Sequence, residues 1–369
     1  MNSLLKVLSL STVVFLASCG SEGSSSSHAT GLSISSTSTG SRIALNTPNV
    51  LRSNDVIFWN DVGGAVKYDI YKGESLLGST TTSSYSLKES GDYVVKAIPS
   101  EDDKERCESK ASEVISYKKI ETEDIFVIDA THTLSTYEEY SIPANVDYVK
   151  IINKDNDSNQ VRALYNTGFV IANRTTPLTI DFDLITYVES NFPDKYFIRY
   201  QGRQAEMPLL SLYFPTGGEV NGNNNLVKGK NGAYNDYDIA LVGKAENGDN
   251  GGNGNTLAKL NNILLRYGGD LVVTGGKGSD GGRGGNRQTY GDAGDGGNGG
   301  NGAASFEVTD NIYSLPEVNN ATLELKGGDA GKAGAKGESA GVNTAKNGNP
   351  GTNGQPYIGR LVNLKYPIN

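Results

Sequence analysis

Short apolar runs, bounded by glycine or polar residues, recur along most of this chain. Run 178–184 alternates apolar and polar residues, which is typical of a half-buried strand. No apolar spacing typical of an amphipathic helix is sustained over a comparable length. We therefore predict an all-β fold, with strands at 56–59, 68–71, 84–87, 91–97, 112–117, 125–128, 149–152, 178–184, 210–214, 238–242, 270–274, 321–325 and 361–364.

In the last third of the chain the pattern changes to a glycine at every third position. Between 291 and 302, glycine or alanine fills two of the three registers, and Asp292, Asp295, Asn298 and Asn301 fill the third. A polyproline-II helix turns once in three residues, so the three registers are three faces of one rod. We predict that the two small faces pack and that the polar face meets water.

Four further tracts repeat this period, at 248–254, 275–286, 328–338 and 348–354. In 275–286 the polar register begins with Lys277, Asp280 and Arg283. A flexible linker is the alternative for such a composition, but sorting of polar residues into one register favours packed rods. The longer tracts follow strand-like runs, a combination that is typical of a solenoid with excursions at its corners.

The N-terminus carries Lys6, an apolar run at 7–16 that is too short to span a bilayer, and then Leu-Ala-Ser-Cys-Gly. This segment resembles the signal of bacterial lipoproteins. The resemblance implies cleavage between Ser18 and Cys19 and acylation of the Cys19 sulfur. The chain would then be held to the cell membrane or outer membrane, on the extracytoplasmic face. Acylation would leave only Cys107, so we predict a free thiol in a loop and no disulfide.

Five regions follow from these patterns: a signal peptide at 1–18, a lipidated Ser-rich tether at 19–43, a β-sandwich at 44–119, a β-rich middle region at 120–226 and a glycine-rich region at 227–369. The sandwich resembles a fibronectin type III domain. The matching residues are Trp59, Tyr68, Tyr71, Gly91, Tyr93 and Ala97. The resemblance implies a spacer or protein-binding module with the Trp and Tyr side chains in its core. The middle region is interpreted as the start of a β-solenoid or as a second sandwich.

Catalytic and metal-binding signatures are sparse. The two histidines, His28 and His132, have no accompanying G-x-S-x-G motif or zinc-ligand spacing, so we predict no metal and no cofactor. A formal net charge of −9 disfavours nucleic acid as a partner. Asp181 and Asp183 alternate on one predicted strand and could face a groove, as a polysaccharide-cleaving enzyme on a solenoid would need. A simple polar outer face explains them equally well.

The glycine tracts resemble the polyglycine-II layers of phage tail-fibre adhesins. The resemblance implies a rigid scaffold whose polar edges meet a ligand. We therefore predict a non-catalytic surface lipoprotein that acts as an adhesin or polymer-binding scaffold, with the membrane and a cell-surface glycan or protein as partners. The alternatives are a polysaccharide lyase or glycoside hydrolase, and a purely structural envelope protein. The candidate binding residues are Lys277, Asp280, Arg283, Tyr290, Asp292, Asp295, Asn298 and Asn301.

Overall fold

The computed structural model describes residues 42–130, 137–153, 163–190, 196–224, 228–233, 244–288 and 290–366. Within these ranges the regular structure is β, apart from two 3-10 turns at Thr122–Asp124 and Gln204–Glu206. The prediction of a mostly β fold is thus confirmed. The predicted signal peptide, Cys19, His28, His132 and the predicted strand at 238–242 lie outside the described residues.

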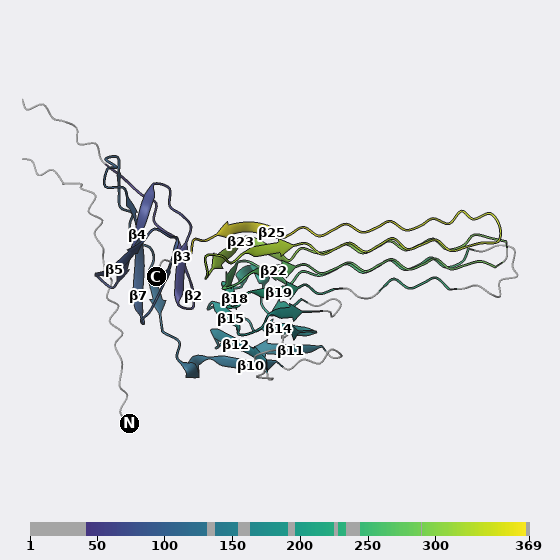
Figure 1. The fold of residues 1–369 in the computed structure, drawn as a ribbon, viewed down its shortest axis with the longest axis horizontal. Coiled ribbons are helices and arrows are strands. Elements are labelled where there is room, and N and C mark those ends of the chain that lie inside the picture. The colour runs from purple at the N-terminus through teal and green to yellow at the C-terminus, as the bar shows by residue number, and fades with distance from the viewer. Residues whose placement is uncertain are drawn as a thin grey trace, which may run out of the picture. The chain divides into compact units, whose positions relative to one another are not determined.

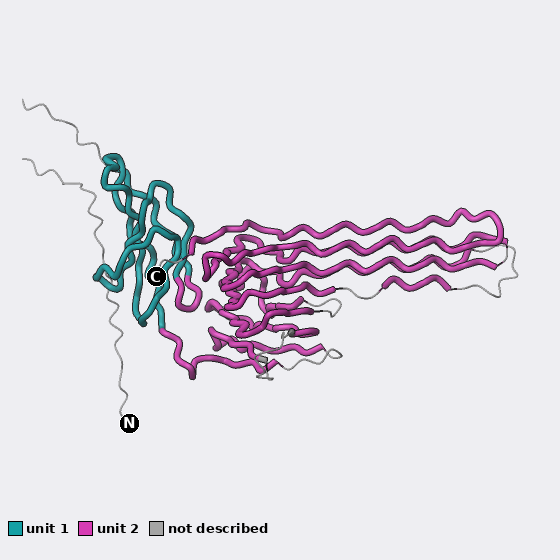
Figure 2. The backbone as a smooth tube through the Cα atoms, in the orientation of Figure 1, with its two compact units in different colours: residues 1–51, 57–118, 368–369 teal, residues 52–56, 119–367 magenta. Residues whose placement is uncertain are grey.

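The chain divides into two compact units (Figure 2). The first contains the described residues up to 51 and residues 57–118, and the second contains 52–56 and the described residues from 119 onward. The middle and glycine-rich regions therefore belong to one unit.

Two sheets and a short strand pair occupy the N-terminal part of the chain. One sheet has the order β2 (Val50–Ser53), β3 (Val56–Trp59), β6 (Ser84–Ser86). The other is antiparallel, in the order β5 (Ser75–Thr80), β4 (Ala65–Lys72), β7 (Gly91–Pro99), β9 (Ile115–Tyr117). Buried Trp59 packs edge-on against Tyr68, with ring centroids 5.1 Å apart. The core is made of inward residues of both sheets, including Ile57, Ile70, Tyr93, Val95 and Ala97.

Cys107 lies in a strand, not in a loop. β1 (Ile43–Ala44) runs parallel to β8 (Arg106–Cys107) and pairs Ala44 with Cys107. This pairing holds the start of the described chain beside Cys107, which is disulfide-bonded. The prediction of a free thiol and no disulfide is therefore wrong.

Three stacks of parallel strands form the body of the second unit. The largest has the order β10 (Phe126–Ala130), β12 (Tyr148–Asn153), β15 (Leu178–Phe182), β18 (Leu210–Phe214), β21 (Ile263–Tyr267), β23 (Phe306–Pro316), β20 (Ala258–Leu260), and β25 (Ile358–Asn363) also pairs with β23. The second stack is β13 (Ala163–Leu164), β16 (Tyr187–Glu189), β19 (Gly218–Asn221), β22 (Leu271–Thr274), β24 (Leu323–Lys326). The third is β11 (Glu138–Ile142), β14 (Thr167–Ile171), β17 (Ile198–Tyr200).

Parallel pairing places like residues above one another inside these stacks. Val149 pairs with Ile180, and Leu212 with Leu265, and all four side chains are buried. In the next inward row the rings of Phe182 and Phe214 stack with centroids 4.5 Å apart and 2° between their planes. The apolar residues Leu178, Ile180 and Phe182 of the predicted run thus supply one layer of a continuous apolar core, whereas Leu184 lies after β15 and is exposed.

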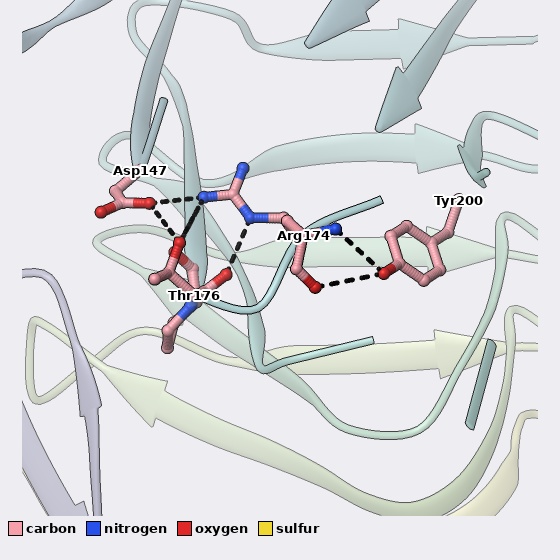
Figure 3. A network of polar contacts seen from close by, with 5 residues as sticks. Asp147, Arg174, Thr176 and Tyr200 are labelled. Carbon is pink, nitrogen blue, oxygen red and sulfur yellow. Dashed lines mark hydrogen bonds and ion pairs between the residues drawn. The ribbon is translucent and has the colours of Figure 1, made fainter. Parts of the chain in front are cut away.

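A buried arginine fixes the corner between β14 and β15. Arg174 donates through Nη2 to Asp147 Oδ1 at 2.6 Å and through Nε to the Thr176 carbonyl at 2.7 Å. On the other side, the Tyr200 hydroxyl bonds to both the N–H and the carbonyl of Arg174 (Figure 3). Burial lowers the pKa of Arg174, and the charge of Asp147 opposes this effect. This network links the segment before β12, which carries Asp147, to the segment after β14, which carries Arg174, and to Tyr200 of β17. We therefore assign it a structural role.

In the part of the chain that the structure describes, six extended segments leave and rejoin the stacks at one corner. The segments form three consecutive pairs. In each pair the first segment follows β19, β22 or β24 of the second stack, and the second segment leads back into β20, β23 or β25. The strands of departure are in register, since Gly218 pairs with Leu271 and Leu271 with Leu323. The segments therefore extend side by side, away from the sheets (Figure 1). We number them tract 1 (222–224 and 228–233), tract 2 (244–256), tract 3 (275–288), tract 4 (290–305), tract 5 (327–341) and tract 6 (342–357).

Candidate binding surface

Backbone hydrogen bonds at every third residue join the tracts into what we call the tract bundle. In tract 4, Gly294 and Gly297 donate to the carbonyls of Gly285 and Gly282 in tract 3, at 2.9 and 2.8 Å. Gly296, in the next register, donates to the carbonyl of Lys346 in tract 6 at 2.8 Å. Tract 4 also accepts N–H bonds from tracts 2 and 5, so it has four bonded neighbours. Two of the three predicted faces are thus packed against other tracts.

Space, not an unusual φ angle, requires glycine at most of these positions. A Cβ atom built on Gly297 would overlap the carbonyl oxygen of Asp249 in tract 2, and one on Gly334 would overlap that of Gly282 in tract 3. Neither glycine has a positive φ. The main chains can therefore approach to hydrogen-bonding distance only where side chains are missing.

The polar register of tract 4 takes part in a ladder of side chains and backbone amides. The Asn298 N–H donates to Asn250 Oδ1 at 2.8 Å, and the Asn298 Oδ1 accepts the N–H of Asn349 at 2.8 Å. The rows on either side repeat the pattern from tract 2 through tract 4 to tract 6. These rows are Asn247–Asp295–Lys346 and Asn253–Asn301–Thr352.

We call the surface formed by the nine residues of these three rows the even face. They are Asn247, Asn250 and Asn253 of tract 2, Asp295, Asn298 and Asn301 of tract 4, and Lys346, Asn349 and Thr352 of tract 6. All nine are exposed except Asp295, which is half-buried. Hydrogen bonds from Lys244 and then from the Lys346 N–H lower the pKa of Asp295. Asn and Asp are needed in this register because their short side chains place a carbonyl oxygen within reach of a neighbouring N–H. The polar register is therefore not simply wetted, as the sequence suggested.

The polar residues of tracts 1, 3 and 5 form a second surface, the odd face. Its ladder runs from Asn224 to Lys277, from Asn231 to Arg283, from Asp280 to Lys332 and from Asn286 to Glu338. Two exposed ion pairs accompany it: Lys277 lies 3.5 Å from Asp329, and Arg283 lies 3.7 Å from Glu338. Such pairs are screened by water and stabilise little.

The eight candidate binding residues thus fall into separate groups. Lys277, Asp280 and Arg283 belong to the odd face. Asp295, Asn298 and Asn301 belong to the even face, and Asp292 nearby accepts the Thr344 N–H at 3.2 Å. Tyr290 lies where tract 4 begins, with 76% of its residue surface exposed.

Two features of this surface could not be read from the glycine period. Tract 1 has only Gly229 and Gly232 in the required spacing, so it was not predicted as a rod. The even face also includes the asparagines of tract 2, which pair across 48 residues of sequence. A signal for them does exist, because Asn247, Asn250 and Asn253 recur with the same period as Asn298 and Asn301.

The two candidate carboxylates in β15 and just after it differ in their surroundings. Asp181 is buried and accepts the Tyr148 hydroxyl at 2.5 Å, whereas Asp183 pairs with Lys150 at 3.0 Å. Burial raises the pKa of Asp181, and the Tyr148 hydrogen bond opposes this rise. Asp181 therefore does not lie open to a groove.

The described residues contain no group of three or more His, Cys, Asp and Glu side chains that could hold a metal ion. Across the same ranges, no helix has the length and apolar character needed to cross a membrane. No family model, curated protein or solved structure matches the chain.

Proposed function

We propose that this chain is a lipid-anchored extracytoplasmic surface protein whose tract bundle is a non-catalytic scaffold for binding a cell-surface glycan, polymer or partner protein. The observation that carries the proposal is the tract bundle itself. Backbone bonds at every third residue and two side-chain ladders hold its polar residues at fixed positions. A surface ordered in this way loses little conformational entropy when a ligand binds.

Finer features of the architecture fit this assignment. The three parallel stacks are a β-solenoid, and the tracts are polyglycine-II rods that leave one of its corners. The N-terminal sheets are a fibronectin type III-like sandwich, supported by the Tyr93 hydroxyl, which donates to the Glu89 carbonyl at 2.5 Å. A tyrosine that bonds to backbone a few residues upstream is a feature of immunoglobulin-like sandwiches. This sandwich would act as a spacer between the anchor and the solenoid.

The burial of Asp181 favours binding over polysaccharide cleavage. General acid–base cleavage requires two carboxyl groups on either side of a substrate bond. Asp181 instead bonds to Tyr148, and Asp183 to Lys150. Incubation with uronic-acid polymers, followed by assays for reducing or unsaturated ends, separates the two functions. Release of such ends would replace the binding proposal with an enzymatic one.

The direct test is binding of the full mature chain to a glycan array and to intact cells. A matched variant with valine at Gly297 and Gly300 would force side chains into backbone carbonyls of tract 2 and disrupt the tract bundle. We expect binding by the parent protein and its loss in this variant. Failure of the parent to bind any glycan, polymer or cell surface would leave a purely structural envelope role.

A further inference from the structure

We propose that the even face binds a neutral polysaccharide chain lying along tract 4, through the side-chain amide groups of its asparagines. This inference rests on the proposed binding function and names the ligand class and the face. Its basis is the orientation that the ladder hydrogen bonds impose on the side-chain amide of each asparagine.

Each ladder bond decides which end of the amide faces outward. A backbone N–H can only donate, so the Oδ1 atoms of Asn250 and Asn298 must face the N–H groups of Asn298 and Asn349. The Nδ2 group is then turned away from the neighbouring tract. The same holds for Asn247, Asn253 and Asn301. The even face thus presents at least five oriented amide donors.

The donors recur at a regular spacing. Three residues of a polyproline-II rod span about 9 Å, and hydrogen-bonded main chains lie roughly 5 Å apart. A periodic grid of this kind suits a ligand whose acceptor oxygens also recur at fixed intervals. Hydroxyl, ring and glycosidic oxygens of a polysaccharide meet this requirement.

Charge and side-chain type argue against other ligands. Lys244 already pairs with Asp295, the charge of Lys346 on the even face also acts on that carboxylate, and the whole chain has a formal net charge of −9, so an anionic polymer gains little. The nine residues of the even face include no aromatic side chain. Protein interfaces usually depend on buried aromatic or arginine anchors, which this face lacks.

Isosteric Asn→Asp substitutions test the Nδ2 donors separately from the ladder bonds. Asn298→Asp with Asn301→Asp keeps the oxygen that accepts each neighbouring N–H but removes both Nδ2 donors. The matched control is Asn231→Asp with Asn286→Asp, which makes the same charge change on the odd face. The reverse substitution, Asp295→Asn, keeps the oxygen that accepts the Lys346 N–H and places an Nδ2 donor where Oδ2 accepts from Lys244, so it adds a donor to the even face and frees Lys244 from its ion pair.

The measurement is the affinity of the full mature chain for dextran, mannan and hydroxyethyl cellulose, with polygalacturonate as the anionic comparison. We expect about tenfold weaker binding for the even-face pair, since two neutral hydrogen bonds are lost. The odd-face pair should bind within about twofold of the parent, and Asp295→Asn should bind several-fold more tightly. Equal unfolding temperatures of the variants would confirm that the ladder is intact.

The outcomes distinguish this inference from the proposed function. Binding by the parent that the even-face pair leaves unchanged overturns the inference and places the ligand elsewhere on the scaffold. Binding to cells, to a protein or to polygalacturonate without binding to any neutral polysaccharide also overturns it. Absence of all binding by the parent overturns the proposed function itself.

Discussion

Glycine and asparagine stabilise the tract bundle in complementary ways. Glycine removes the side chain, so a carbonyl of the next tract can occupy its place, as that of Asp249 does beside Gly297. Asparagine supplies an oxygen for an N–H that no backbone carbonyl reaches, as Asn250 does for Asn298. Together they satisfy the donors of extended chains that do not pair as strands.

Gly297→Ala tests the packing argument at a single residue. Its Cβ would meet the rigid backbone of Asp249, so we expect the free energy of unfolding to fall by about 1–3 kcal/mol. Gly341→Ala is the control, because the nearest atom to its Cβ would be in the exposed Tyr290 ring, at 3.1 Å, and the nearest backbone atom would lie at 3.7 Å, an ordinary contact distance. This control should change stability by less than about 0.5 kcal/mol. Equal losses in the two variants, measured by denaturant unfolding, would refute the packing argument.

The buried carboxyl of Asp181 should make stability depend on pH. Burial raises its folded pKa, against the opposing Tyr148 hydrogen bond and the charges of Lys150 and Arg266, while Asp183 adds to the rise. Below about pH 4 the group is protonated in both states and costs nothing. As pH rises from there through the folded pKa, the unfolded state ionises first and stability is lost.

We therefore expect Asp181→Asn to raise the unfolding temperature at pH 7, with the gain shrinking to nothing in acid. Asp183→Asn is the control, since Asp183 is partly exposed and pairs with Lys150. A gain that is the same at all pH values would mean that packing, and not ionisation, is responsible.

At the scale of elements, the sequence predicts more of the strands than of their pairing. Runs 149–152 and 210–214 became β12 and β18 within about a residue, because their apolar residues face one core. The parallel register that places Gly218 beside Leu271 is set by contacts between distant segments, which local patterns do not encode. The same register determines which asparagine accepts which backbone N–H. The ladder of the candidate site could therefore not be predicted from the sequence either.

Hydrogen exchange tests the arrangement of the tracts. Among the described residues, tract 4 is bonded to four neighbouring tracts, whereas tract 6 is bonded to tracts 4 and 5. Opening tract 4 breaks more bonds, so the Gly300 N–H should exchange more slowly than the Gly351 N–H. Mass spectrometry of deuterated peptides can compare the two tracts in one sample. Exchange in tract 4 as fast as in an unfolded peptide would mean that the tract bundle does not form.

At the scale of the whole molecule, the proposed membrane anchor depends on the chemistry of one sulfur atom, that of Cys19. Cys19 and Cys107 are the two cysteines of the sequence, and Cys107 is disulfide-bonded in the structure. A cysteine sulfur can be acylated or can form a disulfide, but not both. Because the sequence has no third cysteine, lipid on Cys19 would leave Cys107 without a disulfide partner in the same chain, so the proposed anchor and an intrachain disulfide exclude each other.

Cys19→Ala tests in cells whether Cys19 carries lipid. We expect the parent to incorporate labelled fatty acid and to stay with membranes at high salt, because several acyl chains anchor a protein by burial of their methylene groups. The variant should lose the label and leave the membrane fraction. Cys107→Ala is the control and should keep both properties. A disulfide-linked peptide joining Cys19 to Cys107 in the mature parent would contradict lipidation, and the surface location would then need another explanation.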